Sequence, residues 1–521
     1  MLDDTLTLAL DTIRKQKQAI VFTPSRASAE KTAEDISQQT KLFLPNLAQQ
    51  SLKSVSAPTK QCRRLSNCLK KGIAFHHAGL TSNQKQLIEQ EFRNGTIKII
   101  CATPTLAMGL SLPAYRVIIK SLKRYSGRWG MDWIPVLEYH QMAGRAGRPE
   151  YEKMGEAITL AASESQKHEI HEKYLCGLPE DIYSKLAVEP VLRTYLLSLI
   201  ATNITNTKQD ILEFFSQTFW AHQFRDMNKL QSIIDKMLLL LEEWEFIKIQ
   251  GDPLQNNSGF TPAINFNKDQ NINNRTLIKA TLIGQRISQL YLDPYTAHHI
   301  IENLKKSTDS KVELTPFSFL QTICNTLEIS PLLRVKIKEH EHIQEKLVQR
   351  YQQLLESEPA LYDSDYDDFI NSIKTSLFFE EWIDEKDEDY LMEHYGIRPG
   401  EIHTKLATAD WLLYSMIELT KLLQFQPILK ELNKLRIRVK HGVKEELLPL
   451  LKLKGIGRKR ARKLHQNKIK TLKELHQAST QTLSQLLGQK LAQDIKLQLE
   501  NPDQPIQPSK RIGQLSIQKF K

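Results

Sequence analysis

Two arginines three positions apart, Arg145 and Arg148, are the residues of this chain best suited to chemistry. They lie in the segment 141–149, Q-M-A-G-R-A-G-R-P. A guanidinium group is planar and can donate paired hydrogen bonds to phosphate oxygens, and the neighbouring glycines allow a close backbone approach. The sequence predicts that this segment opens a helix, which would place both arginines on one face. We therefore expect a phosphate site here, and the alternative is a pair of surface arginines.

A second segment with polar chemistry is 102–114, A-T-P-T-L-A-M-G-L-S-L-P-A, which directly follows the apolar run I-K-I-I-C-A. The hydroxyls of Thr103 and Thr105 and the exposed amides of this loop could hold a nucleic-acid phosphate or a nucleotide ribose. A third segment, F-H-H-A-G-L at 75–80, stands between another short apolar run and a predicted helix.

Short apolar runs that alternate with helical stretches must position these loops. The runs lie at 18–22, 72–75, 97–102, 116–120 and 156–161. Such alternation predicts a mostly parallel sheet covered by helices on both faces, and ligands of such sheets gather at the carboxyl ends of the strands. After residue 185 the helices at 190–219 and 228–243 and the strands at 244–249 and 260–264 follow the order of a winged helix-turn-helix. The remainder reads as helical.

In this order the segments resemble the second motor domain of superfamily-2 helicases, and in particular the archaeal Hjm/HelQ-type, Ski-like DNA helicases. F-T-P-S-R at 22–26 resembles motif IV, 102–114 motif V and 141–149 motif VI. The resemblance implies that Arg145 and Arg148 are arginine fingers that stabilise charge on the γ-phosphate of ATP. It places Gly109 and Gln141 in the nucleotide cleft, while Ser111 departs from the usual Asn. It places four residues near the DNA backbone: Arg26, His77, Thr103 and Thr105.

The segment 118–139, between motifs V and VI, has two β-rich arms around 126–130 and predicts a hairpin. Arg128, Trp129 and Trp133 at its end could stack on a base step and wedge it apart. The family has its strand-separating hairpin at this place. An ordinary surface hairpin is the alternative.

The segment 398–423 resembles the ratchet helix of the family, whose tryptophan stacks on single-stranded DNA. An apolar stripe is formed by Leu406, Ala409, Leu413 and Met416. At about 100° per residue, Trp411 points away from this stripe, alongside Thr404 and Ser415. Thr404 stands where a basic residue is typical. The alternative for Trp411 is a packing contact between domains.

Basic residues concentrate near the C-terminus, with 15 Lys/Arg against 3 Asp/Glu in 434–475, whereas 356–401 has 15 acids against 3 bases. This polarity indicates a polyanionic partner at the basic end. The segment 450–464, L-L-K-L-K-G-I-G-R-K-R-A-R-K-L, resembles a helix-hairpin-helix element. We expect amides near Gly455 and Gly457 to face a phosphate, with positive charge from Arg458, Lys459 and Arg462.

The last eight residues, Q-L-S-I-Q-K-F-K, match the pattern of sliding-clamp-binding peptides through Gln514, Ile517 and Phe520, although a chance match is equally open. The five cysteines form no C-x-x-C pair, which favours a reducing compartment without disulfides or a metal site. The chain has no apolar run of about 20 residues and no signal-peptide core. We expect a cytoplasmic, nucleoid-associated protein without a membrane partner.

The sequence contains neither G-x-x-x-x-G-K-[ST] nor a D-E-x-H or D-E-A-D box before these motifs. By the resemblance, ATP and Mg²⁺ are held mainly by a first motor domain, which we expect a separate chain to supply. The first hypothesis is therefore a subunit of an ATP-dependent 3′–5′ helicase that acts on single-stranded and forked DNA in replication-coupled repair and is inactive alone. The second is an inactive DNA-binding or clamp-adaptor protein derived from a helicase, and a truncated gene model is a third reading.

The predicted fold class is multidomain α/β plus α. It comprises a RecA-like parallel α/β domain (1–185), a winged helix (186–270), a helical ratchet domain (271–430), a basic helix-hairpin-helix domain (431–503) and a flexible tail (504–521).

Overall fold

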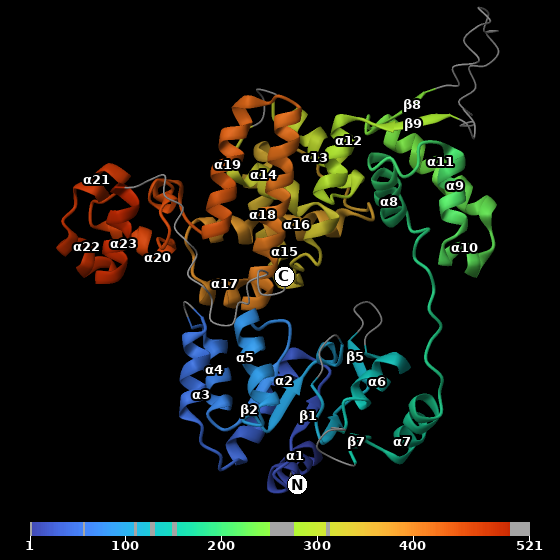
Figure 1. Ribbon diagram of the computed structural model, residues 1–521, viewed down its shortest axis with the longest axis vertical. Coiled ribbons are helices and arrows are strands. Elements are labelled where there is room, and N and C mark those ends of the chain that lie inside the picture. Colours follow the sequence, from blue (N-terminus) through green and yellow to red (C-terminus); the bar gives the residue numbers. More distant parts are fainter. Residues whose placement is uncertain are drawn as a thin grey trace, which may run out of the picture. The chain divides into compact units, whose positions relative to one another are not determined.

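The computed structural model describes residues 3–55, 58–108, 112–125, 131–147, 154–250, 276–308 and 313–500 (Figure 1). The chain divides into two compact units. The first contains Met1–His299 together with Asp387–Thr408, and the second contains Ile300–Lys386 and Ala409–Lys521. The segment 387–408 therefore folds with the N-terminal unit, although the sequence predicted it within one helical domain spanning 271–430.

The first unit is built around a parallel five-stranded sheet with the order β2-β3-β1-β4-β7. The strands are β1 (Ala19–Phe22), β2 (Ile73–His76), β3 (Ile99–Ala102), β4 (Arg116–Ile119) and β7 (Glu156–Thr159). Every residue of the first four strands is buried, as expected for apolar runs covered on both faces. The five apolar runs thus form the sheet that the sequence predicted.

Helices α1 (Asp4–Arg14), α2 (Arg26–Gln39), α4 (Lys60–Leu69), α5 (Ser82–Arg93) and α6 (Val136–Ala143) pack against this sheet. Several of them begin at a side chain that caps the free amides of the first turn. Ser25 accepts from Ser28 N–H before α2, and Thr59 accepts from Cys62 N–H before α4. Thr81 and Gln84 form a capping box at the start of α5. Further helices are α3 (Pro45–Lys53), α7 (Glu164–Ile170) and the π-helical turn η3 (His171–Leu175).

A hairpin follows β4, as the sequence predicted. Strand β5 (Lys123–Tyr125) pairs antiparallel with β6 (Met131–Trp133), so that Lys123 lies opposite Trp133. The predicted tip, with Arg128 and Trp129, lies outside the described residues.

The helices and strands of the predicted winged helix are α8 (Glu189–Ala201), α9 (Lys208–Ser216), α10 (Phe219–Phe224), α11 (Met227–Glu243), β8 (Ile247–Gln250), β9 (Leu277–Ala280) and α12 (Leu282–Leu290). Strands β8 and β9 pair antiparallel. The second strand expected at 260–264 lies outside the described residues, and β9 falls beyond the boundary at 270 that the sequence indicated. Arg193 of α8 donates two hydrogen bonds to Asp293, at 2.6 and 2.8 Å.

The main helices after residue 293 are α13 (Pro294–Lys306), α14 (Pro316–Cys324), α15 (His340–Gln349), α16 (Tyr366–Ile383), α17 (Glu388–Tyr395), α18 (Pro399–Leu422) and α19 (Gln426–His441). Helix α14 packs on α16 around Phe317, Phe369 and Ile373. Helix α18 runs without a break from the first unit into the second.

The C-terminal helices have a separate core. They are α20 (Arg458–Gln466), α21 (Leu472–Gln477), α22 (Thr480–Leu487) and α23 (Gln489–Glu500), preceded by the short 3₁₀ turns η8 (Glu445–Leu447) and η9 (Leu450–Lys452). Leu450, Leu464, Leu475 and Leu483 are among the buried side chains of this core. These findings confirm the predicted α/β plus α fold class. Within the described ranges, no helix combines the length and the apolarity needed to cross a bilayer.

Candidate nucleotide and nucleic-acid site

The loops that the sequence singled out lie at one edge of the sheet. Because the strands are parallel, the segments after β1, β2 and β3 all leave the sheet at its carboxyl edge. Arg26 follows β1, His77 follows β2, and Thr103 follows β3. Thr103 N–H donates to His76 O at 3.3 Å, and the hydroxyls of Thr103 and Thr105 are 3.0 Å apart. Motif V and the F-H-H-A-G-L segment are therefore neighbours.

Motif VI ends a helix instead of starting one, which corrects the prediction from the sequence. Gln141 lies in the last turn of α6, Gly144 follows the helix, and Arg145 lies in the turn after it. Arg145 is thus not on a helical face. The helical pattern V-L-E-Y-H-Q-M-A begins before motif VI, at residue 136, and continues into it. Gly144, which follows Ala143, is a common signal for the end of a helix and could have shown this. Arg148 lies outside the described residues.

Arg145 joins motif VI to motif V. Its Nε donates to Ala107 O at 3.1 Å, and a second guanidinium nitrogen donates to the same carbonyl. The backbones also pair, because Ala114 N–H donates to Arg145 O at 2.9 Å and Gly147 N–H donates to Ala114 O at 2.7 Å. Gly147 has φ +97°, a conformation that favours glycine. Gly109 of motif V lies outside the described residues.

Gln141 has a buried side-chain oxygen, Oε1, to which no described residue donates a hydrogen bond. A buried acceptor without a donor costs free energy, and such groups mark places where a ligand can bind. The hydroxyl of a nucleotide ribose is a donor of the required kind. The residues present therefore fit one side of a nucleotide. No described group of three or more His, Cys, Asp or Glu is arranged to hold a metal ion.

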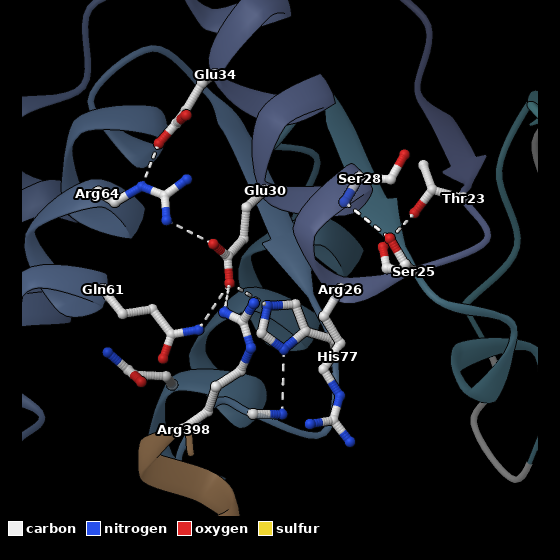
Figure 2. A network of polar contacts seen from close by, with 12 residues as sticks. Thr23, Ser25, Arg26, Ser28, Glu30, Glu34, Gln61, Arg64, His77 and Arg398 are labelled. Carbon is white, nitrogen blue, oxygen red and sulfur yellow. Dashed lines mark hydrogen bonds and ion pairs between the residues drawn. The ribbon is translucent and has the colours of Figure 1, made fainter. Parts of the chain in front are cut away.

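Glu30 is an important residue that the sequence did not single out. It lies on α2 with 2% of its surface exposed, and Figure 2 shows the donors that converge on its carboxylate. Gln61 Nε2 donates to Oε1 at 3.0 Å, Arg64 donates to Oε2 at 2.5 Å, and Arg398 donates to Oε1. No local pattern could have revealed this cluster, because Arg398 is 368 positions away in the chain.

His77 belongs to the same cluster, which corrects its expected position beside DNA. Its side chain is completely buried, its Nε2 lies 3.1 Å from Glu30 Oε1, and its Nδ1 accepts from Gly79 N–H at 3.1 Å. Because Nδ1 is an acceptor, the proton is on Nε2, and the ring donates it to Glu30. Both nitrogens are therefore used within the chain.

The donors around Glu30 decide its protonation state. Burial alone would raise the pKa of this carboxyl, but the hydrogen bond from His77 and the positive charges of Arg398 and Arg64 outweigh burial and lower the pKa to about 2. Burial lowers the pKa of His77, and its hydrogen bond to Glu30 opposes this effect only in part. At neutral pH the cluster thus contains a carboxylate and a neutral imidazole.

Arg26 of motif IV also has a partner within the chain. Its guanidinium forms an ion pair with Glu401 in the first turn of α18, and Glu401 Oε2 also accepts from Arg398 N–H at 3.0 Å. About a third of each side chain of the Arg26 pair is exposed. The predicted contact between Arg26 and DNA therefore has to compete with this carboxylate.

Trp133 lies at the base of the hairpin, where its side chain is half-buried. Its ring is 5.9 Å from that of Tyr174 between centroids, and Lys123 Nζ lies 4.3 Å from its centroid. The sequence placed Trp133 with Arg128 and Trp129 as an exposed end. The pairing register instead puts it opposite Lys123, where its packing fixes the hairpin on the domain.

In α18 the predicted apolar stripe is confirmed, since Leu406, Ala409, Leu413 and Met416 are buried. Trp411 is half-buried. Ser415, expected on an open face beside Trp411, is completely buried and donates its hydroxyl to Trp411 O at 3.0 Å. Thr404 is exposed. The helix is thus covered over a wider arc than its apolar spacing indicated.

The G-I-G segment forms the predicted turn before a helix. Gly455 has φ +88°, and Gly457 is the N-cap of α20. Lys459 is exposed. Arg458 donates to Lys386 O at 2.6 Å, and Arg462 donates to both oxygens of Glu385, at 2.6 and 2.7 Å, and pairs with Glu446. The predicted phosphate contact from Arg462 therefore has two carboxylates as competitors.

A second hairpin in this domain escaped the sequence reasoning. Helices α22 and α23 are joined at Gly488, which has φ +91°. The signal was the L-L-G-Q-K sequence at 486–490, a glycine between two helical patterns. The C-terminal tail with Gln514, Ile517 and Phe520 lies outside the described residues.

Four family models match successive parts of the chain. They are "Helicase conserved C-terminal domain" (residues 2–150), "Helix-turn-helix domain" (155–248), "Archaeal helicase, domain 4" (317–442) and "SAM-like Helix-hairpin-helix tandem" (447–501). The last of these agrees with the two hairpins of the structure.

Curated relatives match along nearly the whole chain. A protein of Pyrococcus horikoshii named "ATP-dependent DNA helicase Hel308" is 36% identical over 92% of this chain, and one of Methanocella arvoryzae with the same name is 34% identical over 95%. The chain spans less than two thirds of the length of these relatives, 63% and 65%. The sheet with its three motif loops, the ordered family matches and these relatives together make the chain similar to the Ski2-like helicases of superfamily 2.

Proposed function

We propose that this chain forms the C-terminal part of an ATP-dependent DNA helicase that moves 3′ to 5′ and unwinds forked DNA. The observation that carries the proposal is the meeting of motifs V and VI: the Arg145 guanidinium reaches the Ala107 carbonyl beside the carboxyl edge of the sheet. The half-buried Arg145 guanidinium suits a nucleotide phosphate, and the open acceptor of Gln141 suits a ribose hydroxyl. The relatives named as ATP-dependent DNA helicases support this reading.

ATP and Mg²⁺ need a second domain in this proposal. The sequence contains no phosphate-binding loop of the G-x-x-x-x-G-K-[ST] type, so that a domain with this loop, on the same polypeptide or on a partner chain, holds the β- and γ-phosphates and the Mg²⁺. ATP supplies the free energy for movement along DNA. Arg145 and Arg148 stabilise the negative charge on the γ-phosphate from this side of the cleft, and Gln141 and Gly109 contact the nucleotide. Without the loop domain the chain hydrolyses no ATP.

DNA is held at several places along the chain. Thr103 and Thr105 contact its backbone, the hairpin with Arg128 and Trp129 separates the strands, and Trp411 stacks on a base of the single strand. In the C-terminal domain, the amides near Gly455 and Gly457 and the Lys459 side chain bind a phosphate. A sliding clamp is a further partner through the tail, and the cytoplasm, at the nucleoid, is the site of action.

A reconstitution tests the proposal. The chain is combined with a domain that carries the phosphate-binding loop, and DNA-stimulated ATP hydrolysis and fork unwinding are measured. We expect Arg145→Gln to lower kcat for ATP by about 10³-fold or more, as for other arginine fingers. Arg93→Gln, which removes an exposed arginine from the last turn of α5, is the matched control and should change nothing.

If the combined protein binds forked DNA but hydrolyses no ATP, the proposal is wrong. The chain would then be an inactive DNA-binding or clamp-adaptor protein.

A further inference from the structure

The start of α18 is attached to the RecA-like part of the first unit by crossed ion pairs. Glu30 of α2 binds Arg398 (Figure 2). Arg26 of α2 binds Glu401. In each of the two segments the arginine precedes the glutamate in the chain, so the first residue of one segment pairs with the second residue of the other. A shift of α18 that brought Arg398 toward Arg26 would place like charges together, so these pairs define one position of the helix.

The two backbones touch between these pairs. Gly400 N–H donates to Gly79 O at 2.9 Å. A Cβ atom on Gly400 would lie 2.3 Å from Ala78 O and 2.6 Å from Leu80 O, so no other residue fits here without movement of one segment. Gly79 N–H in turn donates to His77, whose ring donates to Glu30. A continuous series of hydrogen bonds thus runs from Glu30 to the first turn of α18.

Apolar side chains of the segment 387–408 are also buried, among them Leu391 and Ile402. A cavity of about 220 Å³ borders this segment and is lined mainly by polar side chains, among them Asn83, Thr81, Glu388 and His403. At its outer edge, Lys60 N–H donates to Asp389 Oδ1 at 3.2 Å, and Lys60 Nζ pairs with Glu393. Apolar burial has no preferred direction, whereas hydrogen bonds and ion pairs do, so the polar contacts around Glu30 define where the first turn of the helix lies.

The geometry points to Glu30 as a positioning residue that couples the RecA-like domain to α18. The thirteen residues from Pro399 to Trp411 belong to one unbroken helix, and their first and last Cα atoms are about 18 Å apart at the α-helical rise. A helix anchored at its first turn moves with its anchor. Movement of the RecA-like domain during ATP hydrolysis is therefore passed to the Trp411 segment through the Glu30–Arg398 pair. This inference rests on the proposed function.

The first test separates ATP consumption from DNA movement. In the reconstituted helicase, Arg398→Gln removes the anchor, yet Glu30 keeps Arg64, Gln61 and His77, so that no unpaired charge is buried. We expect DNA-stimulated ATP hydrolysis to stay within about two-fold, while base pairs unwound per ATP fall by about five-fold or more. Lys421→Gln is the control, because it breaks an ion pair with Glu418 on the same helix and has no contact with Glu30.

The second test uses this chain alone and does not depend on helicase activity. Amide hydrogen exchange is measured at Gly400 and Ile402, whose N–H groups donate to Gly79 O and Arg398 O. We expect about ten-fold or faster exchange in Arg398→Gln and in Glu30→Gln than in Lys421→Gln.

The outcomes distinguish the two proposals. Unchanged exchange, or equal losses of ATP hydrolysis and unwinding in Arg398→Gln, would overturn the role of Glu30. Absence of ATP hydrolysis in the unmodified reconstituted protein would overturn only the proposed function, and faster exchange would still show that Glu30 anchors α18.

Discussion

Two clusters of arginine and carboxylate side chains, one in each unit, use the same chemical groups in opposite ways. In the first unit one buried carboxylate, Glu30, is surrounded by donors. In the second unit one guanidinium, Arg462, is shared by two carboxylates, and Glu446 is almost half exposed. Breaking a buried pair leaves an uncompensated charge, whereas surface pairs contribute little. The difference indicates that the first cluster holds the fold and the second can be rearranged.

The largest expected effect is the difference in stability between a variant that lacks the Glu30 carboxylate and one that lacks the Glu446 carboxylate. Glu30→Ala leaves Arg398, Arg64 and His77 without their common acceptor, and we expect it to lower the free energy of unfolding of the first unit by about 3–5 kcal/mol. Glu446→Ala leaves Arg462 paired with Glu385, and we expect a loss of less than about 1 kcal/mol. Urea unfolding of both variants measures this difference. Equal losses would show that burial does not separate the two clusters.

A smaller effect concerns pH. Because burial lowers the pKa of His77 below its ordinary value of 6.5, the unfolded chain binds a proton at this residue before the folded chain does. Stability should therefore fall as the pH decreases below about 6.5, and a protonated Nδ1 would also lose the hydrogen bond from Gly79.

Unfolding midpoints between pH 7 and pH 5 check this prediction. The charges that face His77 are those of Glu30, Arg398 and Arg26. Replacing the ring in His77→Gln should make the midpoint less dependent on pH than in the unmodified chain. The Glu30 carboxyl, with its pKa of about 2, adds its own loss only below about pH 4.5. An equal pH dependence in both proteins would contradict the assigned neutral state of His77.

The smallest effect distinguishes two cations of the second unit. Lys459 is exposed near the G-I-G turn, whereas Arg462 is held by Glu385 and Glu446. We expect Lys459→Gln to reduce the slope of log affinity against log salt by about 0.9 on duplex DNA, the value for one phosphate contact. Arg462→Gln should leave the slope unchanged. A reduced slope for Arg462→Gln would mean that DNA displaces the two carboxylates.

Local patterns in the sequence predicted most of the architecture. The β-branched runs 18–22 and 116–120 became central strands, the G-I-G segment became the turn before a basic helix, and the hairpin formed between β5 and β6. These features depend on periodicity and on glycine conformation within a few residues, which a sequence displays directly. The match of three ordered motifs to a helicase family was confirmed by the comparisons.

The candidate site was less predictable, because its contacts join distant segments. Glu30 stands in no recognisable pattern, and nothing in the segment that begins at Arg398 indicated that its guanidinium would bind Glu30. The resemblance assigned His77 to DNA, and its burial beside Glu30 depends on contacts that the local sequence does not display. The same limit applies to Ser415, which a single-helix projection left exposed although neighbouring helices bury it. For motif VI the spacing of the arginines was compatible with either end of a helix. In the structure the helix ends at Gly144, so that Arg145 follows the helix.

The membership of 387–408 in the first unit has a practical consequence for dividing this protein into fragments. A fragment that stops after the winged helix would contain Glu30, Arg64 and His77 but would lack the guanidinium of Arg398, and the Gly79 carbonyl would lose its partner at Gly400. Such a fragment would also leave Arg26 of α2 and Lys60 of α4 without their carboxylate partners Glu401 and Glu393. Expression of the RecA-like domain as a soluble, native-like piece therefore calls for the distant segment as well, either grafted through a short linker or added as a synthetic peptide.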